Sequence, residues 1–148
     1  MRVFSLSISA ALLVFAANVT ANQSEVSIWD SFLKPKYFAD VELIENSGVF
    51  ELKTPYRAED ASVTPVSITA AFPQSATRYI ETIYMFVDKN PQPLVGIFHL
   101  TPEMGRADLA MRVRVDQYTN VRAIAVLNNG EHHMVTNFVT AQGGCSAP

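Results

Sequence analysis

The chain has 148 residues, with 11 Lys or Arg, 14 Asp or Glu and a net charge of −3 at pH 7. This length suits one globular domain. The acidic balance and the lack of a basic patch give no sign of nucleic-acid binding and argue against binding to an anionic membrane. A single cysteine rules out an antibody-type disulfide within the domain.

The first residues, 1–21, are typical of a secretory signal peptide. Arg2 supplies the positive start, and the run Val3–Ala17 is apolar apart from small serines. Ala21 is the small residue expected before a cleavage site, so the mature protein should begin near Asn22. The competing interpretation is a retained membrane anchor, but the run is shorter than the ~20 residues that a spanning helix needs.

Residues 22–46 are predicted to form an N-terminal helical segment, with the helix itself over residues 24–38. The apolar residues at helical spacing on one face are Val26, Trp29, Phe32 and Leu33. Pro35 should end or kink this helix. Two interpretations stay open: a short helix that caps one end of the core, or an exposed helix that binds a partner.

From residue 48 onward the sequence pattern is typical of strands. Strands are predicted over residues 50–52, 66–70, 79–88, 94–100, 109–115, 121–127 and 131–140. Turn residues separate them, and Asn128-Asn129-Gly130 is a strong hairpin signal. About seven strands at this spacing predict an all-β fold, an immunoglobulin-like antiparallel β-sandwich over residues 47–141. A small open barrel is the alternative.

The strand predicted over residues 79–88 has apolar residues on both faces, which suits a central strand buried on both sides. One face is expected to carry Ile80, Tyr84 and Phe86, and the other Ile83, Met85 and Val87.

The only cysteine, Cys145, lies near the end of the chain in the segment 142–148, behind Gly143 and Gly144. Two adjacent glycines have wide backbone freedom, so we expect a swinging arm with a reach on the order of 15 Å from the last strand. Thiolates are nucleophiles that can hold covalent groups. The functional interpretation is a covalent carrier or redox thiol; the alternative is an incidental tail cysteine. No neighbour would activate the thiol, which favours a substrate-bearing protein over a catalyst.

Other candidate sites are weaker. His132, His133 and Met134 together with Cys145 suggest copper, but adjacent strand residues point to opposite faces, so neither a metal nor a cofactor is expected. Arg112 and Arg114 share a polar strand face. Such a pair could bind an anion such as a sulfonate or a partner carboxylate, and a merely solvated face is the alternative.

The C-terminal Gly143-Gly144-Cys145 resembles the end of SoxY, the sulfur-carrier subunit of the periplasmic thiosulfate-oxidising Sox system. The similarity covers roughly residues 45–145. The motifs arranged as in that family are Asn90-Pro91-Gln92-Pro93, Arg112-Val113-Arg114-Val115, Asn120-Val121-Arg122-Ala123 and the final strand. The resemblance implies a non-catalytic periplasmic carrier that holds thiosulfate-derived intermediates on Cys145 while partner enzymes act on them.

The stretches 77–101 and 111–125 look closer still to SoxYZ-like carriers associated with quinoprotein dehydrogenases. The resemblance implies a SoxZ-like partner. This partner is either a separate subunit or a fused domain, and in the second case this chain is part of a longer fused carrier. Tyr84, Phe86 and Phe98 are candidates for an apolar face that such a partner covers. SoxY proteins usually end in Gly-Gly-Cys-Gly-Gly, whereas residues 146–148 here are Ser-Ala-Pro. An accessory binding module for an exported quinoprotein dehydrogenase, with a dispensable thiol, is the alternative function.

Overall fold

The computed structural model describes residues 27–116 and 118–141. The predicted signal peptide 1–21 and the arm 142–148, which contains Gly143, Gly144 and Cys145, lie outside the described residues. Within the described ranges, no helix has the length and apolar character that crossing a membrane requires.

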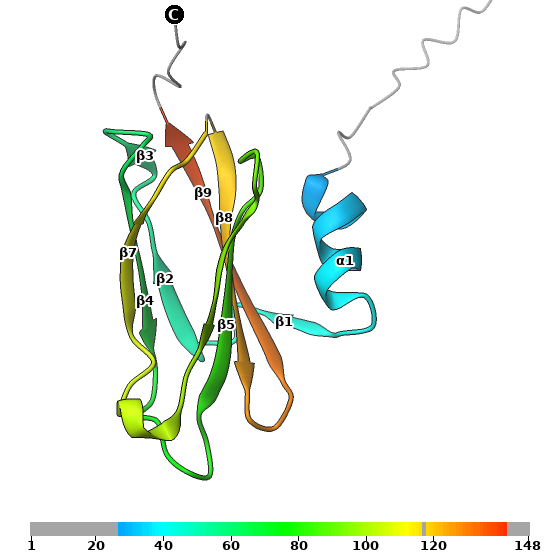
Figure 1. Ribbon diagram of the computed structural model, residues 1–148, viewed down its shortest axis with the longest axis vertical. Helices are drawn as coiled ribbons and strands as arrows, with labels where there is room; N and C mark the ends of the chain where they lie inside the picture. Colours follow the sequence, from blue (N-terminus) through cyan, green and yellow to red (C-terminus); the bar gives the residue numbers. More distant parts are fainter. Residues whose placement is uncertain (1–26, 117, 142–148) are drawn as a thin grey trace, which may run out of the picture.

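Two β-sheets packed face to face form the body of the molecule (Figure 1). The larger sheet has the order β1-β9-β8-β5-β6, with β3 also paired to β9, and consists of β1 (Leu43–Glu45), β3 (Arg57–Ala58), β5 (Ile80–Val87), β6 (Leu94–His99), β8 (Tyr118–Leu127) and β9 (His132–Ala141). The smaller sheet has the order β2-β4-β7 and consists of β2 (Phe50–Lys53), β4 (Thr64–Ala70) and β7 (Leu109–Val113). The predicted immunoglobulin-like β-sandwich with a short N-terminal helix is confirmed.

Two short strands depart from the antiparallel arrangement at one edge of the larger sheet. The short strands β1 and β3 both run parallel to β9, whereas the other described pairings are antiparallel. The chain leaves this edge after β1, forms β2 in the other sheet and returns as β3, so both strands follow the direction of β9. Asn46 and Gly48 make the first crossing possible with positive φ angles of 50° and 75°, a region in which Asn and Gly are favoured.

The core lies between the two sheets and is built from the inward residues of each strand. In β4, for example, Val66, Ile68 and Ala70 are at most 2% exposed, while the residues between them face outward. The largest fully buried contributions from the other sheet include Ile80, Ile83, Met85, Val87, Val121 and Val139.

Strand β5 is buried on both faces, as predicted, but the assignment of Ile80 to a face was wrong. Ile80 packs in the core between the sheets together with Ile83, whereas Phe86 packs on the outer side of the sheet. The pairing of β5 with β8 shifts register between Ile80 and Thr82. An irregularity of this kind inserts an extra residue and reverses the side on which the preceding residue points.

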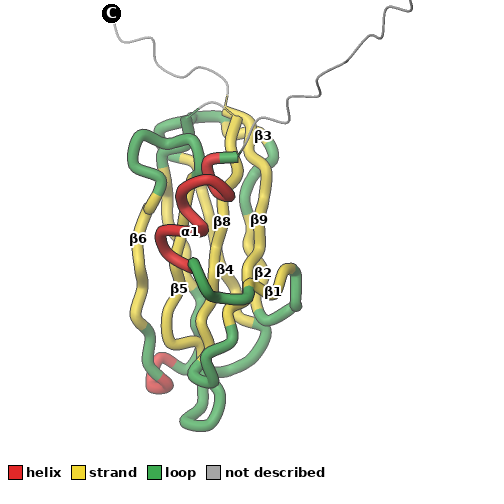
Figure 2. Tube along the Cα trace, turned by 90° about the vertical axis from the view of Figure 1, so that its right-hand side faces the viewer, coloured by secondary structure: helices red, strands yellow, loops and turns green. Residues whose placement is uncertain are grey.

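The N-terminal helix covers the outer face of the larger sheet, where it lies over β5 and β8 (Figure 2). It consists of one π-helical turn, η1 (Trp29–Leu33), followed by α1 (Lys34–Phe38). The expectation that it caps one end of the core was therefore wrong. Pro35 does not end the helix, which continues for three more residues, because Pro35 lies in the first turn of α1, where a missing N–H is tolerated.

A second hydrophobic cluster holds the helix in place. Its buried members are Trp29, Leu33, Phe38, Phe86, Ile124 and Met134. Phe38 makes an edge-on contact with Tyr84, with ring centroids 5.2 Å apart. The apolar face that we expected a partner to cover is thus covered by the chain's own helix at Tyr84 and Phe86, while Phe98 packs against the core between the sheets.

Candidate functional site

The end of β9 is held on both sides at Thr140, and β3 also holds Ala141, the last described residue. On one side Tyr118 and Thr119 of β8 pair with Thr140 and Val139. On the other side β3 pairs with Thr140 and Ala141. The backbone N–H of Thr140 donates to the carbonyl oxygen of Tyr56 at 2.7 Å, and its hydroxyl donates to the same oxygen at 3.0 Å. Cys145 is four residues beyond Ala141, so the Cα atoms of the two residues are at most about 14 Å apart.

We call the end of β9, Thr140 and Ala141, the arm root. Three large aromatic side chains lie exposed next to it. Tyr56 is 72% exposed, Tyr118 57% and Phe138 47%. The rings of Tyr56 and Phe138 have centroids 6.3 Å apart, and the Lys89 ammonium lies 4.7 Å from the centre of the Tyr118 ring. Sequence reasoning missed these residues, although Tyr118 and Phe138 occupy outward positions of period-two strands. They give the arm root an aromatic rim.

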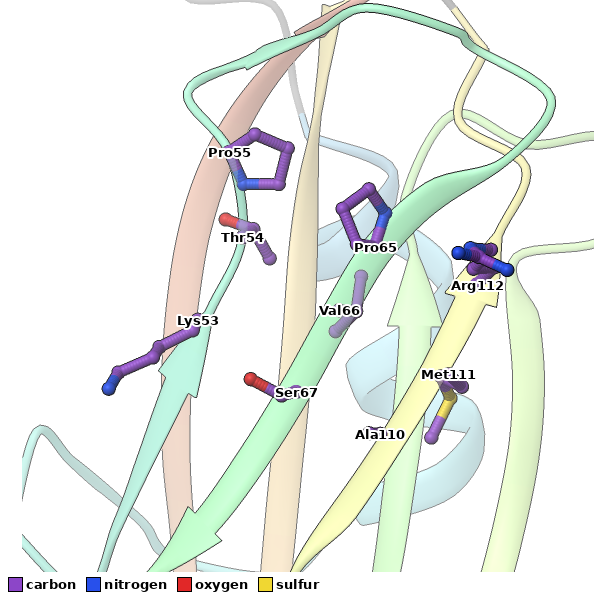
Figure 3. Close-up of a pocket in the computed structure, with 9 residues that line it drawn as sticks. All are labelled: Lys53, Thr54, Pro55, Pro65, Val66, Ser67, Ala110, Met111 and Arg112. Atoms are coloured by element: carbon purple, nitrogen blue, oxygen red, sulfur yellow. The ribbon is translucent and has the colours of Figure 1, made fainter.

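The predicted arginine pair is divided between two environments. The guanidinium of Arg114 lies 3.4 Å from the Asp116 carboxylate. Arg112 instead lines an open hollow of about 750 Å³ on the outer face of the smaller sheet, with Lys53 at the opposite side (Figure 3). Arg112 is therefore the stronger candidate for binding an anion, because among the described residues it has no ion-pair partner, whereas Arg114 has a surface partner in Asp116.

The histidines point in different directions, as the strand period requires. His132 packs edge-on against the Phe38 ring at 6.0 Å, while His133 is buried and its Nε2 atom lies 3.4 Å from Glu131. His99 contacts the hydroxyl of Thr82 at 3.2 Å. Among the residues that the structure describes, no group of three or more His, Cys, Asp or Glu side chains is arranged to hold a metal ion.

A buried ion pair between β8 and the end of β5 lies against the helix, and sequence reasoning did not find it. The Nε–H of Arg122 donates to both carboxylate oxygens of Asp88, at 3.0 and 2.9 Å. The guanidinium also lies 4.7 Å from the Trp29 ring and donates to the hydroxyl of Thr136 at 3.2 Å. Burial raises the pKa of Asp88, although Arg122 acts to lower it. Both side chains of this pair are at most 10% exposed, so the pair supports the fold.

Comparison with solved structures places this fold among known proteins. The sulfur carrier protein SoxY from Chlorobium limicola f thiosulfatophilum matches with a TM-score of 0.60 and 21% identity, over 77% of this chain and 96% of that chain. The superoxide reductase (neelaredoxin) from Ignicoccus hospitalis matches with a TM-score of 0.55 and 14% identity, over 64% and 80%. A putative superoxide reductase from Thermotoga maritima gives 0.55 and 14%, over 70% and 95%. At these identities the likeness shows a shared fold only.

No curated protein sequence matches the chain. A protein family does match: sulfur oxidation protein SoxY, over residues 34–145. The match covers well over half of the chain, includes the whole β-sandwich and ends on Cys145. The chain therefore belongs to the SoxY family of sulfur oxidation proteins.

Proposed function

We propose that the chain is a carrier of sulfur compounds, which holds thiosulfate-derived groups covalently on Cys145 while partner enzymes act on them. One observation carries this proposal: the SoxY family match runs through the sandwich and ends on the only cysteine of the chain. The Chlorobium protein with the same fold is a sulfur carrier protein. The chain itself bears the cargo and performs no catalysis.

The proposed chemistry requires a thiolate and an external oxidant. The Cys145 thiolate bonds to the outer sulfur of thiosulfate and forms Cys–S–S–SO₃⁻. Two electrons leave the pair of sulfur atoms, and a partner redox enzyme takes them up. Because β3 and β8 hold the end of β9, the protein presents its cysteine from a fixed point. The partner enzyme supplies the groups that activate the thiol.

The proposed partners follow from the family and from the sequence. A SoxZ-like subunit or domain and Sox-type redox enzymes are the partners that a SoxY-family carrier serves. The predicted signal peptide supports a periplasmic location. The likeness of residues 77–101 and 111–125 to quinoprotein-associated carriers supports a link to an exported quinoprotein dehydrogenase.

The test is the intact mass of the protein purified from its own periplasm, with and without reductant, followed by mapping of the C-terminal peptide. We expect sulfur or sulfonate adducts on Cys145 that reductant removes. Cys145→Ser should abolish them while the free energy of unfolding stays unchanged, and Ser146→Ala is the matched control that keeps them. Adducts that persist in Cys145→Ser would sink the proposal.

A further inference from the structure

Two adjoining hollows lie on the outer face of the smaller sheet, and we call them together the trough; Figure 3 shows the residues that line the first. Its first hollow, of about 750 Å³, lies over β2, β4 and β7. A second hollow, of about 570 Å³, adjoins it and shares Pro55, Pro65 and Arg112. The function proposed above makes no use of this trough.

The strand register explains why the first hollow exists. Lys53, Ser67 and Ala110 lie side by side in one row across β2, β4 and β7, and Arg112 lies beside Pro65 in a neighbouring row. Strands are spaced about 4.8 Å apart, so the two outer strands lie roughly 10 Å from each other. The short side chains of Ser67 and Ala110 leave the space between the long side chains of Lys53 and Arg112 empty.

The chemistry of the first hollow suits an anion on a thin, partly apolar segment. None of the 9 residues that line it is acidic. Within residues 27–116 and 118–141, Arg112 has no ion-pair partner, so its guanidinium is available to oxyanions. Lys53 lies 3.4 Å from Glu51, but both side chains are 63% exposed, and such surface pairs are weak and exchange readily.

The trough also leads to the arm root. Arg57 lines the second hollow and pairs with Thr140 in β9, while the next residue, Ala58, pairs with Ala141. The arm therefore begins one strand away from the trough. The Cα atom of Cys145 has about 14 Å of reach from Ala141, before its side chain and cargo are counted.

We propose that this trough holds the C-terminal arm, residues 142–148, when Cys145 carries an anionic sulfur group. Arg112 and Lys53 bind the sulfonate oxygens, and Pro55 and Pro65 contact the arm itself. The proposal rests on the carrier function above and adds a dependence on charge: a sulfonate-bearing adduct docks, whereas a bare thiol or a neutral adduct does not.

The experiment compares an anionic and a neutral adduct, each attached through a disulfide bond to the cysteine of the purified protein. Tetrathionate loads the anionic group: the Cys145 thiolate attacks an inner sulfur, Cys–S–S–SO₃⁻ forms and thiosulfate leaves. Methyl methanethiosulfonate loads the neutral one: Cys–S–S–CH₃ forms and methanesulfinate leaves. In NMR spectra of labelled protein, we expect the amide signals of Ser67, Ala110 and Arg112 to move with the anionic adduct only, and less at high salt.

Variants locate the contact. Arg112→Gln should remove most of these shifts and speed the release of the anionic adduct by dithiothreitol several-fold, without changing release of the methyl adduct. Arg78→Gln is the matched control, because Arg78 is an exposed arginine that stacks on Phe72, at 4.2 Å, away from the trough. It should behave like the wild type.

Three results would overturn the docking proposal: equal shifts with both adducts, shifts that survive Arg112→Gln, or shifts that grow with protein concentration and so report a second copy. Mass spectrometry separates this failure from failure of the carrier function. An adduct on Cys145 without shifts rejects docking alone, whereas a Cys145 thiol that tetrathionate does not modify rejects both.

Discussion

The two outer faces of the sandwich differ: the chain's own helix covers one, and the other is open. The outer face of the larger sheet is apolar at Phe86 and Ile124 and is closed by the chain's own helix. The outer face of the smaller sheet is bare, with Ser67, Ala110 and Arg112 at its outward positions. A closed face can bury an aromatic cluster and an ion pair, while an open one can exchange ligands. This contrast places stability on one side of the molecule and candidate binding on the other.

The largest effect is expected from the aromatic contact that closes the helix-covered face. Phe38→Ala should lower the free energy of unfolding by about 3–5 kcal/mol, because a fully buried ring is replaced by a cavity. Urea unfolding of the purified protein measures this loss of stability. Phe32→Ala is the matched control: that ring is 52% exposed, and its removal should change stability by no more than about 0.5 kcal/mol. Equal effects of the two substitutions would mean that the helix does not stay on the sheet.

The second effect tests the buried ion pair and depends on pH. Arg122→Met should cost about 3 kcal/mol at pH 7, because it leaves the Asp88 carboxylate buried without its counter-charge. Burial already raises the pKa of Asp88 above its ordinary value near 3.8, and loss of Arg122 raises it further. A raised pKa means that the folded state holds the proton more tightly than the unfolded state. Stability therefore falls as pH rises from the unfolded-state value near 3.8 through the raised pKa of the folded state.

The cost of Arg122→Met should therefore shrink as pH falls toward 3.8, and urea unfolding at pH 7 and pH 4 measures the difference. Arg114→Met is the control, since its pair with Asp116 is exposed and should cost less than about 1 kcal/mol at either pH. A cost of Arg122→Met that does not vary with pH would show that the protonation of Asp88 does not govern this cost between pH 4 and pH 7.

The smallest effect on stability is expected on the open face. Ala110→Leu fills the first hollow, but position 110 is exposed, so the free energy of unfolding should change by no more than about 0.5 kcal/mol. The same substitution should abolish the amide shifts that the anionic adduct causes at Ser67. Ala39→Leu, an exposed alanine at the end of α1, is the matched control. Intact shifts in Ala110→Leu would reject the trough as the docking site.

The strand pattern was readable from the sequence wherever a segment was long enough to show its period. The hairpin at Asn129-Gly130 also formed as predicted, with the Leu127 N–H donating to the carbonyl oxygen of Glu131 at 2.9 Å and a φ of 89° at Gly130. The strands β1 and β3 were missed because each is three residues or fewer and exists only through pairing with β9.

The site was only partly predictable for a related reason. Its cysteine and its cationic strand were visible in the sequence, but the separation of Arg112 from Arg114 depends on Asp116. The pairing of Asp88 with Arg122 joins residues 34 positions apart. No local pattern reports a contact between residues so far apart, since it depends on which strands become neighbours.

The pairing of β3 and β8 with the end of β9 also sets the local concentration of the group that Cys145 carries. A group tethered within about 14 Å of Ala141 meets the neighbouring surface at an effective concentration of millimolar or more. A trough that binds free thiosulfate only with a millimolar Kd can thus hold the tethered group for a large share of the time. An enzyme that binds the group with modestly higher affinity than the trough can still take it over. Loading and delivery therefore need no separate step that releases the arm from the trough.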